Sequence, residues 1–428
     1  MRYSHIALIA LASLPLSAST SPLSAQSLAE RVDAAPAGRV QFTYAARPGV
    51  CGNGRSYYMA GANSWYGSFN DTDRREACVA GPVRVVLDRA DREIVSIATY
   101  AGPVPQPIAG VTDLGLVRAS DAATYLLGLA ERSQGRVSRD AIGPAMLADS
   151  VDATPRLLAI ARNQNAARAT RSSAISWLGR SFDERPRAVR DMVPVLVTIA
   201  SNDDDNQSVR EQALRTLARL EHGAGTAALL ELARDAQRGW LAQQAITSLT
   251  TSGDPRARAH LRDVVRAAAL QDMALAAAIR GLGGEHASGE DIKLLRDTYG
   301  KFDGDKSREN AVAAIATFGG AENVRWLLAL ARNPDQPTAT RRRAIQHAYR
   351  GGTPIPEIIK IYDETTDTQV KEAVMAVLVE SGEKAAVDKL MQIARSDDSA
   401  ARRRRAISLL GRSSDERVRE FLASIATR

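Results

Sequence analysis

The sequence predicts a mainly α-helical protein: a right-handed α-solenoid of about nine helical hairpins over residues 120–428, preceded by a small disulfide-bonded antiparallel β module. A motif of the form Leu-Leu-x-Leu-Ala-Arg returns from Ser120 onward at intervals of 31 to 39 residues, and a second apolar motif follows each copy. Units of this length cover each other's apolar faces when they stack. Hydrophobic residues make up 45% of the chain and aromatic residues only 5%, which favours closely packed helices.

The first 25 residues are typical of a secretory signal peptide. Arg2 provides the positive start, Ile6 to Leu16 are largely apolar, and small residues lead up to a cleavage site after Ala25. The apolar run is shorter than the roughly twenty residues that span a bilayer. We therefore expect a periplasmic or secreted protein that is not inserted in a membrane after the signal is cleaved.

The chain has two cysteines, Cys51 and Cys78, and both lie in the predicted β module. An oxidising compartment would allow them to pair. They have no neighbouring histidine to complete a zinc site and do not form a Cys-x-x-Cys motif. The prediction is a structural disulfide, with no metal and no cofactor.

The β module is expected over residues 39–102. Residues 40–44 alternate between apolar and polar, and the runs 83–87 and 94–100 predict an antiparallel hairpin with a loop at 88–92. Prolines then predict a linker over residues 103–119. Between the cysteines lies an aromatic cluster with two interpretations, a stacking surface for a glycan or the core of a small module. Its members are Tyr57, Tyr58, Trp65, Tyr66 and Phe69.

Each repeat is predicted to contain two helices. The second motif, Arg-x-x-Ala-Ile-x-x-Leu-Gly, is clearest at 171–179 and 403–411. Its terminal glycines, such as Gly179, Gly283 and Gly411, are expected to end the second helices in a left-handed conformation. These residues resemble the short HEAT-like repeats of bacterial proteins, the type also found in phycobilin lyases. The resemblance implies a scaffold whose second helices line a concave binding surface, and it implies no particular reaction.

Basic residues cluster at the start of two predicted second helices. One interpretation is a surface that attracts an acidic partner. The other is structural, because single arginines recur at this place in Arg171 and Arg210, where they would pair with acidic residues of the loop before. A net charge of +7 over 428 residues is mild and does not indicate nucleic acid. The partner-binding candidates are Arg341, Arg342, Arg343, Arg402, Arg403, Arg404 and Arg405.

Catalytic signals are weak. Deoxyhypusine hydroxylases, built from similar repeats, hold two irons on several His-Glu pairs, whereas this chain has only Glu221-His222 and Glu285-His286, in reversed order. No nucleophile elbow or phosphate-binding glycine loop occurs in the sequence. The sequence therefore predicts a non-catalytic protein-binding scaffold of the bacterial envelope or the cell exterior. The alternative is an envelope glycan-binding protein that uses the aromatic cluster.

Overall fold

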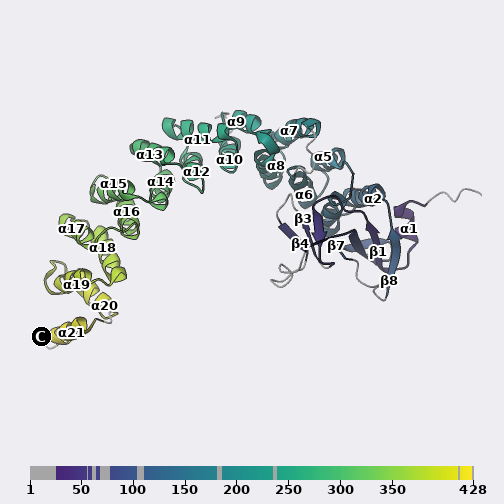
Figure 1. Ribbon diagram of the computed structural model, residues 1–428. Coiled ribbons are helices and arrows are strands. Elements are labelled where there is room, and N and C mark those ends of the chain that lie inside the picture. Colours follow the sequence, from purple (N-terminus) through teal and green to yellow (C-terminus); the bar gives the residue numbers. More distant parts are fainter. Residues whose placement is uncertain are drawn as a thin grey trace, which may run out of the picture. The chain divides into compact units, whose positions relative to one another are not determined.

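The computed structural model describes residues 26–54, 56–59, 64–67, 78–103, 110–180, 186–234, 239–412 and 415–426. Within them the chain divides into two compact units, one ending at Ala153 and the other beginning at Thr154. The first unit contains all the described strands, and the second consists of helical hairpins (Figure 1). The predicted signal peptide lies outside the described residues.

The described residues of the first unit form two four-stranded sheets and four helices. The strand order is β7-β6-β1-β8 in one sheet and β4-β3-β2-β5 in the other. The strands are β1 (Gly38–Tyr44), β2 (Val50–Gly52), β3 (Ser56–Met59), β4 (Ser64–Gly67), β5 (Val79–Ala80), β6 (Val83–Ala90), β7 (Glu93–Ala101) and β8 (Val111–Leu116). The helices are α1 (Leu28–Ala34), α2 (Ala119–Arg132), α3 (Gly135–Asp140) and α4 (Ile142–Met146).

In the core of this unit, side chains of β1 pack against helices α2 and α4. Val40, Phe42 and Tyr44 are fully buried on one face of β1, as their alternation predicts. The Phe42 ring meets the edge of Tyr125 on α2 at 6.2 Å, and the Tyr44 hydroxyl donates to the carbonyl oxygen of Pro144 at 2.6 Å. The first helix that we expected in the solenoid, α2, therefore belongs to the β-containing unit.

Two further expectations about this unit are wrong in part. The predicted linker at 103–119 contains β8, which pairs in parallel with β1 through Gln41 and Asp113. The hairpin loop is also shorter than predicted, because β6 and β7 extend until only Asp91 and Arg92 separate them. Asp91 has a φ of 52°, the left-handed conformation that such tight turns require.

The predicted disulfide is confirmed. Cys51 on β2 and Cys78 are bonded, with their Cα atoms 5.2 Å apart, and the bond ties β2 to the start of β5. Replacing both cysteines with serine should lower the stability of the first unit by about 3 kcal/mol, because the loop that they close gains freedom when the chain unfolds. Hydrogen-exchange mass spectrometry should show faster exchange in β2 and β3 and unchanged exchange in the second unit. Wild-type exchange rates in β2 would contradict this.

The second unit is an α-solenoid, as predicted. Its described residues form eight hairpins and a final helix. The first helices are α5 (Thr154–Arg162), α7 (Pro186–Ser201), α9 (Thr226–Arg234), α11 (Pro255–Ala267), α13 (Gly289–Thr298), α15 (Ala321–Arg332), α17 (Ile355–Glu364), α19 (Lys384–Ser396) and the final α21 (Glu416–Ala426). The second helices are α6 (Arg168–Leu178), α8 (Gln207–Arg219), α10 (Gly239–Leu249), α12 (Asp272–Leu282), α14 (Asp305–Phe318), α16 (Thr338–Arg350), α18 (Thr368–Ser381) and α20 (Ala400–Leu410).

The helices of this unit form two layers (Figure 1). Each second helix packs on the next second helix, and most first helices also contact the next first helix. An alanine at a fixed place in every second helix lies in the interior and lets the helices approach. These buried alanines are Ala174, Ala213, Ala245, Ala278, Ala311, Ala344, Ala373 and Ala406.

The three glycines predicted to end second helices in a left-handed conformation do not have it, whereas Gly382, after α18, does. Gly179, Gly283 and Gly411 have φ values of −79°, −87° and −58°. At Gly283 the reason for glycine is close packing, because a Cβ atom there would lie 2.2 Å from the Cβ of Ala314 on the next second helix. The glycine therefore serves the contact between repeats.

Candidate partner-binding surface

Three arginines occupy the same buried place in three hairpins. Arg171, Arg210 and Arg341 are 4%, 8% and 6% exposed. In each, Nε donates at 3.0 Å to the carbonyl oxygen of the alanine ten residues earlier, at the end of the first helix. This bond satisfies a carbonyl group that a helix end leaves without a partner. The shared role is to fix the turn within the hairpin.

The acidic partners of these arginines come from two different loops. Arg210 contacts Asp203 at 2.5 Å in the loop before it, as predicted. Arg171 instead reaches the loop of the following hairpin, where Nη1 and Nη2 each donate to Asp205 at 2.6 Å. Arg341 also reaches forward, to the hydroxyl of Thr365 at 3.1 Å and to Asp367 at 3.4 Å. The forward contacts join consecutive hairpins.

Arg341 is therefore wrong as a partner-binding candidate, since its guanidinium is buried and already held by the repeat. Arg402 and Arg403 are also engaged, although less buried. Arg402 Nε contacts Asp397 at 2.8 Å, and Arg403 Nη1 donates to the carbonyl oxygen of Asp397 at 2.6 Å. Asp397 further accepts a hydrogen bond from the hydroxyl of Tyr362 at 2.5 Å. These arginines fix the turn of the last hairpin, and Tyr362 on α17 joins that turn to the preceding hairpin.

The electrostatics of this cluster follow from its hydrogen bonds. Burial would raise the pKa of Asp397, but hydrogen bonds from Tyr362, Ser399 and Arg402 outweigh it and lower the pKa below the usual range. Asp397 is thus a stable anion that compensates Arg402. Since Asp397 compensates Arg402, the positive charge at the surface of α20 comes from the exposed Arg404 and Arg405.

The four remaining candidates lie on the exposed face of the second-helix layer. Arg342 and Arg343 belong to α16, and Arg404 and Arg405 to α20, and all four are exposed. Arg343 reaches back to Glu309 on α14 at 2.9 Å, and Arg342 reaches forward to Gln369 on α18 at 3.5 Å. Because these contacts run from second helix to second helix, the side chains lie on the face that this layer presents. Helices α16 and α20 each contain four arginines and no acidic residue.

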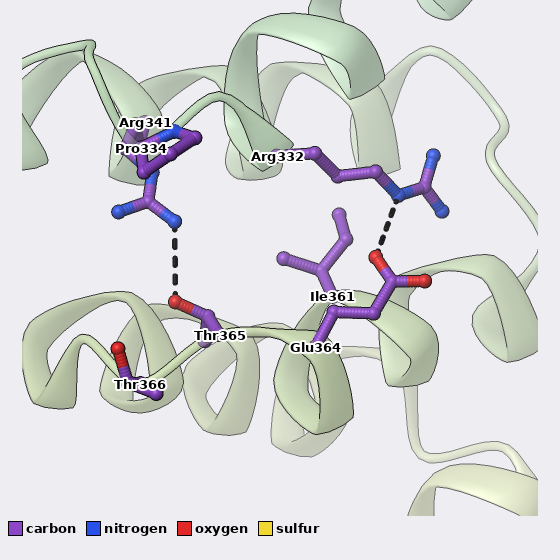
Figure 2. A pocket seen from close by; sticks show the side chains of 7 residues that line it. All are labelled: Arg332, Pro334, Arg341, Ile361, Glu364, Thr365 and Thr366. Carbon is purple, nitrogen blue, oxygen red and sulfur yellow. Dashed lines mark hydrogen bonds and ion pairs between the residues drawn. The ribbon is translucent and has the colours of Figure 1, made fainter.

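A small cavity of about 150 Å³ lies between the turns of two neighbouring hairpins (Figure 2). Arg332 pairs there with Glu364 at 3.2 Å, and Arg341 with Thr365. Both cations that line the cavity are thus occupied by the chain itself. The cavity is a by-product of the turn contacts, and the exposed arginines do not line it.

The aromatic cluster lies partly outside the described residues. Tyr57 is buried, Tyr58 is half-buried, and the register of β3 with β4 pairs Tyr57 with Tyr66 and Tyr58 with Trp65. Phe69 lies outside the described residues. Burial of Tyr57 agrees with a core role for that residue.

The histidines of the described residues do not gather with other potential metal ligands. Burial lowers the pKa of His260 and of His347, which disfavours a charged ring at both places. No group of three or more histidine, cysteine, aspartate or glutamate side chains within the described part of the chain could hold a metal ion. No helix in the same ranges is both long and apolar enough to cross a bilayer.

Comparison with known proteins agrees with the repeat architecture. A family model described as HEAT repeats matches residues 154–250 and 193–283. The chain contains HEAT repeats. No curated protein sequence matches it. Among solved structures, human deoxyhypusine hydroxylase in complex with glycerol is similar at 17% identity, over 60% of this chain and 94% of that chain, with a TM-score of 0.26. A TM-score this low establishes no common arrangement of helices.

Proposed function

We propose that the chain is a non-catalytic scaffold that binds an acidic protein on its second-helix face. The observation that carries the proposal is the group of four exposed arginines on α16 and α20, which we call the arginine surface: Arg342, Arg343, Arg404 and Arg405. Their neighbours in the repeat, Arg341, Arg402 and Arg403, are held by partners within the chain. Of the exposed four, Arg343 alone has an ion pair within the described residues, with Glu309, and the positive charge of the other three suits recognition of an anion.

We further propose that the protein acts in the cell envelope or outside the cell. The signal-like residues 1–25 support export. The disulfide between Cys51 and Cys78 also supports it, because disulfides persist mainly in oxidising compartments. HEAT repeats are a binding architecture that hosts many functions, so the partner must be identified from the surface chemistry.

Affinity capture from an envelope fraction tests the proposal. The Arg342→Glu, Arg404→Glu variant should recover the partner at least about tenfold less than wild type, because two attractions become repulsions. The matched control is Arg325→Glu, Arg419→Glu, which makes the same change of charge on first helices α15 and α21. It should recover the partner as well as wild type does.

The same capture separates the scaffold from the glycan alternative. A Trp65→Ala, Tyr66→Ala variant should keep the protein partner. If wild type and the Arg342→Glu, Arg404→Glu variant recover the partner equally well, the partner does not bind the arginine surface through acidic groups. Recovery of a glycan that the aromatic variant loses would place the function in the first unit instead.

A further inference from the structure

The second helices present a row of side chains whose charges follow a pattern. The row consists of the residue directly before each buried alanine, one from each second helix, and all its members except the buried Ala277 are partly or fully exposed. Its first five members are uncharged and its last three are charged. In order they are Ser173, Gln212, Gln244, Ala277, Asn310, Arg343, Glu372 and Arg405.

At the charged end of the row, the residue on α16 is positive, the residue on α18 is negative and the residue on α20 is positive. Arg343, Glu372 and Arg405 are all exposed. Within the described residues, no ion pair involves Glu372 or Arg405, while Arg343 contacts Glu309. Exposed Glu372 therefore divides the arginine surface into two positive parts. A partner that complements both parts must avoid placing an acidic group opposite α18.

The spacing of the row matches one backbone conformation. Packed helices lie about 8–10 Å apart, so neighbouring charges in the row are separated by roughly that distance. A polyproline II segment has three residues per turn and rises about 3.1 Å per residue, so every third side chain lies on one side, about 9 Å from the last. In an ideal β-strand, residues i and i+3 point to opposite faces, so a strand could not place three such side chains against the row.

We propose that the partner segment is an extended, polyproline II-like peptide with acidic, basic and acidic residues at positions i, i+3 and i+6. Its acidic groups contact Arg343 and Arg405, and its basic group contacts Glu372. Flanking acidic residues reach Arg342 and Arg404. This inference rests on the proposed function, because it specifies the chemistry of the protein that the arginine surface binds.

Two labelled peptides of equal composition and charge test the order of charges. The aligned peptide is Glu-Glu-Pro-Lys-Pro-Glu-Glu, and the reordered peptide is Lys-Glu-Pro-Glu-Pro-Glu-Glu. In fluorescence anisotropy at low ionic strength, the full-length protein should bind the aligned peptide on the order of fivefold more tightly, since exposed ion pairs are individually weak. Glu372→Lys should abolish this preference, because each peptide then places two glutamates and one lysine opposite the three cations of the row. Glu380→Lys, an exposed change on the same helix, should leave it unaltered.

Three other results of this experiment would each contradict the inference. Equal affinity of both peptides for wild type, or an equal gain for both in Glu372→Lys, would show that only net charge is recognised. Binding of neither peptide would overturn the proposed function together with this inference. Tighter binding to phosphatidylglycerol vesicles, in competition with the aligned peptide, would identify the surface as one for anionic lipid.

Discussion

Replacing Asp205 with alanine is expected to destabilise the second unit by about 3–5 kcal/mol. Asp205 and Arg171 are both 4% exposed at their side chains and make two hydrogen bonds of 2.6 Å. Without the carboxylate, the Arg171 guanidinium is a buried cation whose remaining partner among the described residues is the carbonyl oxygen of Ala161. Denaturant unfolding should show the loss, and hydrogen exchange should place it in α5 to α8.

A matched control and a double variant separate charge from packing. Asp204→Ala changes the same loop at an exposed side chain and should cost less than about 0.5 kcal/mol. Arg171→Met with Asp205→Ala should recover much of the loss, because no buried charge is then left uncompensated. A single Asp205→Ala variant as stable as wild type would show that the pair does not join these hairpins.

The repeat itself could be predicted from the sequence because its signals are local. Apolar spacing and the recurrent motifs identify residues such as Ala174 and Ala406, which are indeed buried in the second helices. The disulfide could be predicted because the chain offers only one pair of cysteines. Each of these inferences needs only a pattern and a short range of sequence.

Contacts between distant elements could not be predicted in the same way. β8 is short and follows a proline-rich stretch, and it becomes a strand because β1, some seventy residues earlier, offers a parallel edge. Similarly, Arg171 and Arg341 match the motif of Arg210, yet they reach forward to acids of the next hairpin. Which loop provides the carboxylate depends on how the hairpins stack.

The division of the arginine runs follows from helical geometry. Arg341 and Arg343 are only two residues apart, so they lie on different sides of α16. One faces the turn and is buried, and the other faces solvent. A basic run at a helix start therefore contains both structural and available arginines, and the position of the buried alanine distinguishes them. On α18 the residue directly before the buried Ala373 is Glu372, and it is exposed, as Arg343 is on α16.

Replacing Asp291 with alanine should cost the second unit about 3 kcal/mol. Its carboxylate is fully buried and accepts hydrogen bonds from Arg258 and Arg262 on α11, each at 2.6 Å, and from Ser288 in the capping box of α13. The change removes a helix cap and the anion that holds two first helices together. The two arginines are about one quarter exposed, so water partly compensates them, and the cost is smaller than at Asp205. Asp297→Ala, on the exposed side of α13, should cost less than about 0.5 kcal/mol.

The contribution of Asp291 should also depend on pH. Burial raises its pKa, but the hydrogen bonds from Arg262, Ser288 and Arg258 outweigh burial and bring the pKa to about 2, from 3.8 for an unperturbed aspartate. A lowered pKa in the folded state stabilises the protein above about pH 4, and this stabilisation is lost as the pH falls toward 2. The difference in unfolding free energy between wild type and Asp291→Asn should therefore be constant near neutral pH. It should shrink by about 2 kcal/mol between pH 4 and 2. A difference that stays unchanged over this range in denaturant titrations would show that the Asp291 carboxylate is not preferentially ionised in the folded chain.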